Sequence, residues 1–463
     1  MTLQAPSPDG LWTPPAIIPP DVDPHVLVLA ARSPGNQIRG WSRKVFYEDV
    51  WRPAPTTPVL VTQPEALRRI FLDEAEDFPQ GALFRRMFRP AWGQGVLTAE
   101  GAAWRWQRHA SATAFRPATV SELTPLIVAA TERAVTEWIT KSAKGPIDLE
   151  PAITRLTFDI IVDTMLSGGE YFDRDQMKAR ISAFFRDIGR IRLSYMFLPD
   201  AYHGHRPDAH SKLREPLLAD IRRMVTARRS LPARGDLVDL LLAAKDPETG
   251  QAMDDALIAD NIMGFILAGH ETTSVGLTWA SYVLAAHPKT AQRIREEVRA
   301  VAPQGPITAD HAPQLVHTRQ VVSEVLRLYP PGFLLTRVAA KDCELAGLKV
   351  RAGTRINIPV YALHRHRKRW RDPDAFDPSR FAPEAPPPDR YAYLPFGAGP
   401  RICMGAAFAM LESVLILATL ARRADLAFTG RKPPEPVAVF ALRPKGGMPM
   451  RVTVAPDPKS YAT

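Results

Sequence analysis

A glycine-rich loop with one cysteine stands directly before a long apolar segment in the C-terminal part of the chain. The loop reads FGAGPRICMG over residues 396–405, and the spacing over Ala406–Arg423 predicts a helix. A thiolate at a helix start lies near the positive end of the backbone dipole. Glycine also lets backbone N–H groups come close to the sulfur. The pattern therefore predicts a site that holds an anionic sulfur ligand against a metal.

The number of cysteines narrows the chemistry of this loop. The chain has two, Cys343 and Cys403, which are too few for a tetrathiolate zinc site or an iron–sulfur cluster. A disulfide between them is open on number alone, although 463 residues can bury a core without one. A haem ligand and a nucleophile remain as functional roles for Cys403, beside the plain alternative of a small buried side chain.

Composition indicates a soluble globular protein, with 46% hydrophobic and 23% charged residues. No apolar run approaches the roughly 18 residues that a membrane helix needs. The N-terminus, MTLQAPSPDGLWTPPAIIPP, lacks the basic start and apolar stretch of a secretory signal. We therefore expect a cytoplasmic protein with reduced thiols. Its prolines predict an extended arm over residues 1–24.

The chain is basic, with a formal net charge of +10. Such an excess suits an acidic protein, an anionic membrane or a nucleic acid. We find no zinc finger or RNA-binding signature, so we do not expect a nucleic-acid partner. The most basic run, HRHRKRWR at His364–Arg371, is either a solvated loop or, together with Arg105 and Arg108, a docking surface for an acidic protein.

Helical spacing dominates the rest of the chain and predicts a mainly α fold with a small β region. We find no repeat and no Gly/Ser linker, so we expect one domain over residues 1–463. The predicted helices are Pro64–Leu72, Ala102–Ala114, Glu122–Thr140, Ile153–Met165, Lys212–Arg229, Leu237–Ala244, Asp254–Ala286, Thr290–Ala302, Pro313–Leu328 and Ala406–Arg423. The predicted strands are Val59–Thr62, Cys343–Val350, Thr354–Val360 and Met450–Val454.

The segment Asp254–Ala286 is unusually long for a helix, and AGHETT interrupts its apolar centre at residues 268–273. Gly269 permits the close approach of a ligand or a local break in the helix. Threonine hydroxyls can bond the carbonyls that such a break frees, or a group held in the gap. A zinc-protease motif is excluded, because Ser274 stands where HExxH needs its second histidine.

A third motif is a pair of opposite charges, Glu324 and Arg327, at positions that share one helix face. Their neighbours are apolar, which predicts a partly buried pair. A buried ion pair needs further hydrogen bonds to be tolerated. Arg380, in the segment FDPSRF, is a candidate to supply them.

Together these motifs resemble the cytochrome P-450 superfamily of haem-thiolate monooxygenases. The cysteine loop matches the signature F-x-x-G-x-R-x-C-x-G, and the match extends to Ala409 and Glu412. AGHETT resembles the oxygen-activation segment of the family's central helix. In the third motif, Glu324 and Arg327 match the family's E-x-x-R pair, and Arg380 matches the arginine of the family's meander motif. Trp104-x-x-x-Arg108 resembles a helix that meets a haem propionate. The motifs follow one another in the family's order over nearly the whole chain.

The resemblance implies a single-domain fold with haem b (iron protoporphyrin IX) between the long central helix and the helix after the cysteine loop. Cys403 would be the axial ligand of the iron. Thr272 would hydrogen-bond the bound oxygen, and Glu271 would relay protons to it. Glu324, Arg327 and Arg380 would brace the fold behind the haem. The other implied cofactor contacts are Trp104, Arg108, Ala268, Gly269, Arg337, Phe396, Arg401 and Gly405.

By the same resemblance, the substrate pocket is apolar and would draw on Phe84, Phe265, Phe333, Leu334 and Phe440. The implied reaction is hydroxylation of a small hydrophobic organic substrate by O2. The chain ends soon after the haem helix, so we expect the electrons to come from a separate ferredoxin or flavodoxin with its reductase. A peroxide-dependent haem-thiolate peroxygenase and a non-catalytic haem sensor remain alternatives, although the Glu271–Thr272 pair disfavours both.

Overall fold

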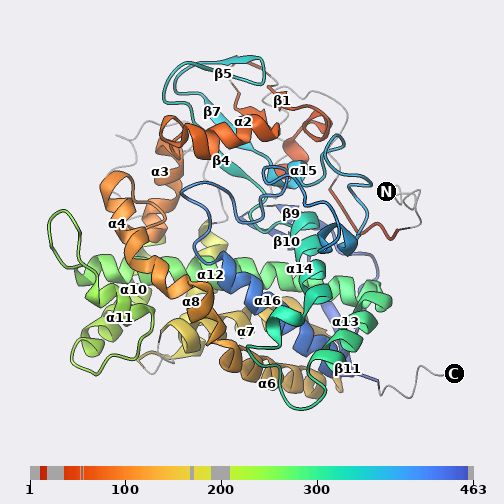
Figure 1. Cartoon of the computed structure of the whole chain (residues 1–463). Helices are drawn as coiled ribbons and strands as arrows, with labels where there is room; N and C mark the ends of the chain where they lie inside the picture. The colour runs from red at the N-terminus through yellow and green to blue at the C-terminus, as the bar shows by residue number, and fades with distance from the viewer. Residues whose placement is uncertain are drawn as a thin grey trace. The chain divides into compact units, whose positions relative to one another are not determined.

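The computed structural model describes residues 11–17, 36–52, 54–55, 57–166, 171–188, 209–438 and 440–456 (Figure 1). The predicted mainly α fold with a small β region is confirmed. The chain divides into two compact units. The first comprises Met1–Gln80, Ile127–Ile153 and Thr272–Thr463, and the second comprises Gly81–Leu126 and Thr154–Glu271. One domain over residues 1–463 stays a prediction, and most of the predicted arm (1–24) lies outside the described residues.

The predicted helices are present, with small shifts at their ends. The helices that carry the argument below are α3 (Gly81–Trp92), α4 (Gly101–Ala112), α6 (Thr124–Ser142), α7 (Leu149–Met165), α12 (Asp255–Ala286), α13 (Pro288–Val301), α14 (Val316–Leu328) and α16 (Ala406–Arg423). The other α-helices are α2 (Pro64–Arg68), α5 (Pro117–Ser121), α8 (Arg174–Ile188), α10 (Ala209–Arg228), α11 (Leu237–Ala243) and α15 (Val360–Leu363). Helices α3, α5, α8 and α15 are absent from the prediction, although the apolar residues of α3 recur at helical spacing between its arginines.

The four sheets lie in the first unit. The largest has the order β1-β2-β7-β4, with β2 parallel to β7 and the other pairs antiparallel. Its strands are β1 (Val50–Trp51), β2 (Val59–Val61), β7 (Arg355–Ile358) and β4 (Leu335–Val338). A three-stranded sheet pairs β11 (Pro449–Val454) with β3 (Ile147–Asp148) and β8 (Ala424–Phe428). Two hairpins join β5 (Cys343–Leu345) to β6 (Leu348–Val350) and β9 (Pro436–Ala438) to β10 (Leu442–Pro444).

The strand predicted over Cys343–Val350 is therefore wrong in detail, because this segment folds back on itself as a hairpin. Ala346 and Gly347 both have positive φ, 49° and 83°, at the turn between β5 and β6. Left-handed residues at both central positions are typical of a two-residue hairpin turn. The alternating pattern of the segment predicts extended strands, but it does not indicate the turn between them.

A buried apolar cluster joins the large sheet to the segment after β2. Val59 and Val61 are fully buried, and Ile356 of β7 belongs to the same cluster. Ile70 and Phe71 enter it from a π-helical turn, Arg69–Asp73, that follows α2. Burial of such side chains contributes about 1.5–3 kcal/mol each. The cluster fixes the backbone of Phe71, against which the cysteine loop packs.

Helix α16 is held by its neighbours in the first unit. It packs against α13 and α14. Arg295 of α13 is buried and donates hydrogen bonds to the carbonyl oxygens of Ala421 and Ala424, at 2.8 and 3.3 Å. A cation there satisfies carbonyls that the helix itself leaves open. These bonds hold the C-terminal end of α16.

A proline-containing strap, residues 11–17, crosses the first unit. Its Trp12 ring lies 6.1 Å from that of Tyr282 and 5.9 Å from that of Phe376, measured between centroids. The Tyr329 hydroxyl donates to the carbonyl of Pro15 at 2.7 Å, and the amide of Ile17 donates to the Tyr361 hydroxyl at 2.8 Å. The strap thus ties the N-terminal part of the chain to α12, α14 and α15.

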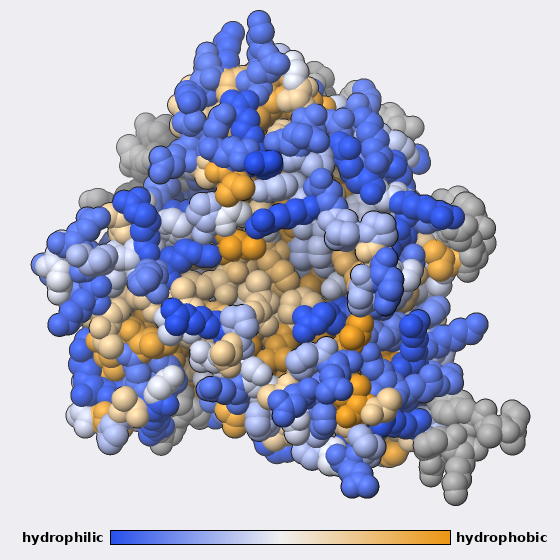
Figure 2. Space-filling model, in the orientation of Figure 1, coloured by the Kyte–Doolittle hydropathy of each residue, from blue (hydrophilic) through white to orange (hydrophobic). Residues whose placement is uncertain are grey.

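Hydrophilic residues predominate among the outermost side chains on the face drawn in Figure 2. Within the described residues, no helix combines the length and apolarity needed to cross a membrane. The basic run His364–Arg371 is not the solvated loop that the sequence allowed. Its first three residues are buried, and Arg367 pairs with Asp374. Lys368 and Arg369 share one acidic partner, Asp49, at 3.1 and 2.5 Å, so the run is partly neutralised.

Candidate functional site

The cysteine loop ends where α16 begins. Gly405 is the N-cap residue of α16, and Cys403 lies two residues before it. The amide of Cys403 donates to the carbonyl of Phe396 at 2.9 Å, which closes the loop on itself. Cys403 is exposed, and it forms no disulfide with Cys343. Position and exposure suit a ligand to a group outside the chain, and they argue against the small buried side chain of the plain alternative.

Gly399 is the residue of the loop that only glycine can fill. Its φ is +71°, and a Cβ atom there would lie 1.7 Å from the carbonyl oxygen of Phe71. An L-residue is strained at such a φ, and the clash is with backbone, which cannot turn aside. The close approach fixes the loop against the buried cluster described above, so that Arg401 and Cys403 leave the loop in defined directions.

Two arginines of the predicted site lie close together in the first unit. Arg337 comes from β4, and Arg401 from the cysteine loop. Burial lowers the pKa of Arg337 to about 10, and the positive charge of Arg401 adds to this effect. The other contacts of Arg337 are neutral: the carbonyl of Thr336 at 2.7 Å and the ring of Phe71 at 4.9 Å. Arg401 donates to the Gln80 side chain at 3.2 Å.

This arginine pair has the donor chemistry for a ligand with two carboxylates. No carboxylate of the described residues lies within ion-pair distance of Arg337, although two cations face each other there. Guanidinium groups bind carboxylates in a planar, two-point geometry. The residues present therefore fit the two propionates of the haem that the sequence analysis implies.

The Glu324–Arg327 pair is fully buried, more deeply than the partial burial predicted, and it is completely satisfied. Arg327 bonds both carboxylate oxygens of Glu324 at 2.7 Å. Its remaining N–H groups donate to the carbonyls of His364, Pro373 and Ala375, at 2.6–2.8 Å. Arg380 lies 3.5 Å from the same carboxylate. Backbone carbonyls therefore supply the extra hydrogen bonds that we predicted, and Arg380 adds only a longer and weaker contact with Glu324.

Helix α12 runs without a break through AGHETT, so Gly269 does not interrupt it. Most of its central residues are buried, but Phe265, Ala268 and Thr272 keep exposed surface. They lie three and four positions apart and so share one face. Glu271 is only 3% exposed. The helix therefore presents one open stripe that carries the predicted Thr272 and Ala268.

The other side of Gly269 is occupied by α7. A Cβ atom on Gly269 would lie 2.5 Å from Cδ1 of Ile161. Thr157 of α7 donates to the carbonyl of His270 at 3.0 Å, and the Phe158 ring meets the His270 ring edge-on at 5.8 Å. Close helix packing is therefore a second reason for glycine at this position, besides the space for a ligand that the sequence indicates.

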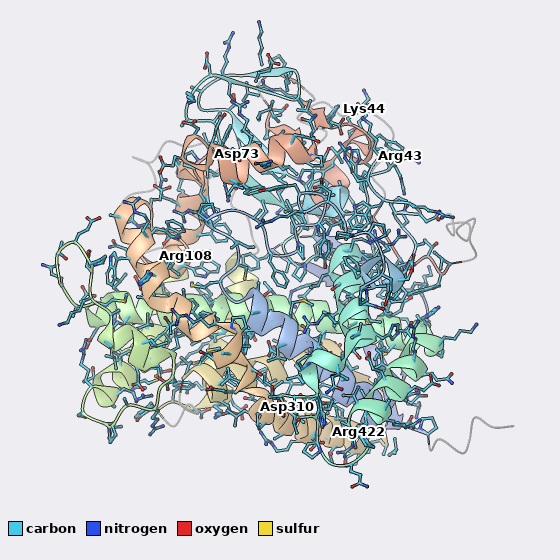
Figure 3. The ribbon with its side chains drawn as sticks, in the orientation of Figure 1. Arg43, Lys44, Asp73, Arg108, Asp310 and Arg422 are labelled. Atoms are coloured by element: carbon cyan, nitrogen blue, oxygen red, sulfur yellow. The ribbon has the colours of Figure 1, made fainter. Side chains whose placement is uncertain are left out.

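The remaining predicted cofactor contacts lie on α4 of the second unit. Trp104 and Arg108 are one helical turn apart, and the Arg108 guanidinium lies 5.8 Å from the Trp104 ring. Figure 3 labels Arg108 on this helix. Both side chains are partly exposed. The pair has the composition of a propionate contact, a role that stays a prediction.

The predicted pocket residues come from several elements. Phe84 of α3 packs against Phe88 at 4.5 Å, and Phe265 of α12 packs against Phe115 at 5.4 Å. Phe333 is 4% exposed and faces Trp41 at 6.4 Å, so it belongs largely to the core. Leu334 is partly buried beside β4, and Phe440 lies between β9 and β10.

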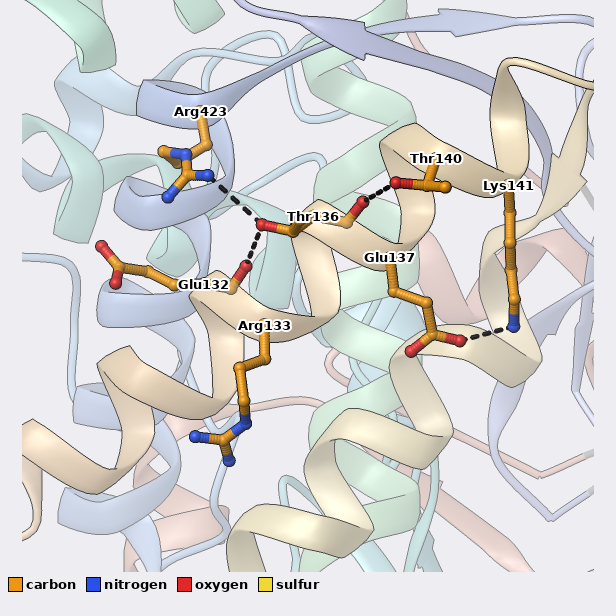
Figure 4. Close-up of a pocket in the computed structure, with 7 residues that line it drawn as sticks. All are labelled: Glu132, Arg133, Thr136, Glu137, Thr140, Lys141 and Arg423. Carbon is orange, nitrogen blue, oxygen red and sulfur yellow. Dashed lines mark hydrogen bonds and ion pairs between the residues drawn. The ribbon is translucent and has the colours of Figure 1, made fainter.

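A polar groove on α6 contains none of the predicted site residues (Figure 4). Lys141 pairs with Glu137 at 2.5 Å, and Arg423 donates to the Thr136 hydroxyl at 3.3 Å. Its lining residues are Glu132, Arg133, Thr136, Glu137, Thr140, Lys141 and Arg423. Because the groove contains neither the cysteine loop nor any other predicted site residue, we do not take it as the functional site.

The sequence analysis missed the residues that support the site from elements far along the chain. Phe71 and Gln80 contact the cysteine loop, and Thr157 and Ile161 contact α12. A threonine within an apolar helix is common, and no local pattern marks these residues. Only the packing of distant segments brings them to the site.

Comparison with known proteins places the chain and its fold in one family. The family model for cytochrome P-450 matches residues 43–449. The chain is 31% identical over 379 residues to cyclooctat-9-en-7-ol 5-monooxygenase of Streptomyces melanosporofaciens, covering 80% of this chain and 81% of that protein. It is 33% identical over 370 residues to a cytokinin hydroxylase of Arabidopsis thaliana, with coverages of 77% and 71%.

A crystal structure of a cytochrome P-450 has the same fold, with a TM-score of 0.79 over 97% of this chain and 100% of that one, at 24% identity. The exposed cysteine before α16 and the open stripe of α12 both lie within the residues that the family model matches. The chain belongs to the cytochrome P-450 family.

Proposed function

We propose that this cytochrome P-450 hydroxylates a small hydrophobic organic substrate with one atom of O2, and that Cys403 is the axial ligand of its haem b. The observation that carries the proposal is the exposed Cys403 at the start of α16, two residues after Arg401. A haem-thiolate centre needs one anionic sulfur and cations for two propionates, and one loop together with β4 supplies both.

The chain's own residues have separate tasks in holding the cofactor. Cys403 provides the thiolate, which the positive end of α16 stabilises. Arg337 and Arg401 would bind propionates, with Arg108 and Trp104 as further contacts. Phe396, Gly405, Ala268 and Gly269 would contact the ring. The bound haem supplies the activation of O2, which a thiolate ligand favours by pushing electron density to the iron.

Proton delivery is the task we assign to Glu271 and Thr272. The Thr272 hydroxyl stands on the open stripe of α12, where it can donate a hydrogen bond to a bound ligand. The Glu271 carboxylate is nearly buried one residue before it. A carboxylate in such a place can pass protons by way of water to the hydroxyl. Ala268, one turn earlier, leaves room beside Thr272.

Apolar side chains from α3 and α12 support a hydrophobic substrate. The name of one relative specifies cyclooctat-9-en-7-ol, and a second Streptomyces protein, 31% identical over 427 residues, is named cyclooctatin synthase. We therefore propose cyclooctat-9-en-7-ol as the first substrate to test, with a fatty acid, a steroid and a small aromatic compound as alternatives.

We propose a separate ferredoxin or flavodoxin, with its reductase, as the source of electrons, in the cytoplasm. Arg105 and Arg108 remain the candidates for its docking, because Asp49 and Asp374 partly neutralise the basic run. A docking role predicts that the rate of electron transfer falls steeply with added salt. A peroxygenase or a haem sensor would need neither the partner nor the Glu271–Thr272 pair.

The test uses the haem-loaded protein, a ferredoxin with its reductase, and the substrate set above. Substrates that displace water from the iron are first found by the low-to-high-spin shift of the spectrum. We expect Thr272→Ala to divert electrons into hydrogen peroxide and to lower product per electron pair by roughly a hundredfold, the lower range for a lost proton-transfer group.

Thr278→Ala is the matched control, because Thr278 is a buried residue of the same helix whose hydroxyl bonds the carbonyl of Ser274 at 2.7 Å. Equal coupling in Thr272→Ala and the control would remove Thr272 from the mechanism. Product formation with hydrogen peroxide alone, at the same rate as with O2 and the partner, would favour the peroxygenase.

A further inference from the structure

Thr157 is a buried threonine of α7 whose hydroxyl reaches a neighbouring helix. Its Oγ1 donates to the carbonyl oxygen of His270 at 3.0 Å and lies 3.3 Å from the carbonyl of Thr154 in its own helix. Both helices belong to the second unit at this point. Thr157 has no exposed surface. The bond therefore joins two packed helices in a place from which water is excluded.

The bond differs from those of Thr164 and Thr278, two other buried threonines in these helices. The hydroxyl of Thr164, also on α7, donates at 2.7 Å to the carbonyl of Ile160, four residues earlier in the same helix. Thr278 of α12 does the same with Ser274. Bonding back to one's own helix is the usual behaviour of a helical threonine. Thr157 instead places its hydroxyl on the helix that carries the proposed proton-delivery pair.

The acceptor of this bond is well placed to orient Glu271. The carbonyl of His270 and the amide of Glu271 belong to one planar peptide unit. A hydrogen bond to that carbonyl therefore limits rotation of the plane from which the Glu271 side chain departs. The next residue along the helix is Thr272.

Three further contacts hold the same turn of α12. The His270 ring bonds the carbonyl of Ile266 through Nδ1 at 2.6 Å, so Nδ1 carries a proton. Phe158 packs edge-on against that ring, and Ile161 fills the space beside Gly269. Thr157, Phe158 and Ile161 share one face of α7. Helix α7 thus packs against this turn of α12 on the side opposite to the open stripe.

We propose that Thr157 is a positioning residue for the reaction: its hydroxyl fixes the peptide plane between His270 and Glu271 and so sets the direction of the Glu271 and Thr272 side chains. This inference rests on the proton-delivery role proposed for that pair. Without the bond, the turn has more than one arrangement, and protons reach the bound oxygen less often before peroxide escapes.

The test compares three variants of the haem-loaded protein. Thr157→Val keeps the shape and removes the hydroxyl, and Thr157→Ser keeps the hydroxyl. Thr164→Val removes a buried hydroxyl from the same helix without touching α12. We expect Thr157→Val to raise peroxide release per electron pair roughly fivefold, the equivalent of one hydrogen bond. Thr157→Ser should restore the wild-type ratio, and Thr164→Val should keep it.

A second readout does not depend on turnover. Amide hydrogen exchange over residues 270–275 should be roughly fivefold faster in Thr157→Val than in Thr164→Val. The infrared band of carbon monoxide bound to the reduced haem should broaden in Thr157→Val alone, because it reports the polar groups beside the ligand. The reduced carbon monoxide complex should otherwise keep its thiolate-type absorption in every variant, which shows that the fold and Cys403 are intact.

The results separate this inference from the function on which it rests. If the wild-type protein hydroxylates no compound of the set, the proposed function fails first. If the wild type forms product but Thr157→Val matches Thr164→Val in coupling and in exchange, Thr157 has no positioning role. A loss in Thr157→Val that Thr157→Ser does not restore would assign the effect to packing and would also overturn the inference.

Discussion

Arg327 is fully buried and Arg337 is partly buried in the first unit, and their surroundings differ in kind. Arg327 is paired with a buried carboxylate and spends every N–H group on the chain itself. Arg337 has a carbonyl, an aromatic ring and a second arginine as neighbours. The first charge is neutralised by the fold. The second charge is neutralised only by something the fold does not contain.

The difference separates a structural arginine from a ligand-binding one without reference to any motif. A buried cation costs several kcal/mol unless an anion and hydrogen bonds repay it. At Arg327 the anion and the hydrogen bonds come from the chain itself, so the residue stabilises the fold with or without cofactor. At Arg337 we propose that the haem propionates supply the anion, so the cost would be present in the protein before the haem binds. Each prediction below tests one side of this contrast.

The largest effect is expected from the ligand itself. Cys403→Ser removes the thiolate, so the reduced carbon monoxide complex should lose the absorption band of thiolate-ligated haem completely. Difference spectroscopy measures this directly. Cys343→Ser is the control, because Cys343 is a partly buried residue of β5. Survival of the band in Cys403→Ser would refute the site altogether.

The next effect concerns the self-satisfied region. Arg327→Met leaves the Glu324 carboxylate buried without its cation, which should cost about 3–5 kcal/mol of the free energy of unfolding. Urea unfolding of the haem-free protein measures it. Arg319→Met, at an exposed position of the same helix, should change stability by at most about 0.5 kcal/mol. A haem-free Arg327→Met protein as stable as the wild type would break the contrast.

Arg337→Met should act in opposite directions with and without haem. In the haem-free protein it removes a buried cation that faces Arg401, so the free energy of unfolding should rise slightly. In the loaded protein it removes a charge-assisted bond worth about 1.5–3 kcal/mol, so haem should leave roughly ten- to a hundredfold faster. Transfer of haem to apomyoglobin measures the rate. A loss of stability in both forms would place Arg337 with Arg327.

The smallest effect per step of the measurement, about 1.4 kcal/mol for each pH unit, is a pH dependence that belongs to the self-satisfied region. His364 is buried between the carbonyl of Arg327, at 3.2 Å, and the amide of Leu394, at 2.8 Å. Burial, aided by the charge of Arg327, lowers the pKa of His364 to about 3. The unfolded chain therefore binds a proton that the folded chain refuses as the pH falls below about 6.5.

Stability should consequently fall with pH between about 6.5 and 3, by about 1.4 kcal/mol for each pH unit from this one group. Urea unfolding at several pH values gives the slope. His364→Gln removes the titrating group, so its slope should be shallower than that of the wild type by this amount. Parallel slopes for the two proteins would show that the folded protein accommodates the charged imidazole.

The motifs of the chain predicted its family, its cysteine loop and its buried Glu324–Arg327 pair. They could do so because each motif is local, so its residues reach one another within a loop or a helical turn. The apolar spacing likewise predicted the long helix α12. It did not predict α3, where arginines share the helix with the aromatic residues, or the hairpin turn at Ala346 and Gly347.

What the sequence could not predict depends on contacts between distant segments. Nothing near Arg337 in the chain indicates that Arg401 lowers its pKa, or that Phe71 lies beneath both. The partial neutralisation of Lys368 and Arg369 by Asp49 is likewise a tertiary event, and it changes the interpretation of the whole basic run. The roles of the candidate catalytic residues stay predictions until the variants above are measured.

The strap at residues 11–17 has a practical consequence for anyone who trims or tags this enzyme. A truncation that ends before residue 11 leaves Trp12 in place against Tyr282 and Phe376. A cut beyond residue 17 uncovers Tyr282 and Phe376 and strips the hydroxyls of Tyr329 and Tyr361 of their partners. Shortened versions of that kind would expose an aromatic patch to one another, so they should aggregate more readily than the intact chain.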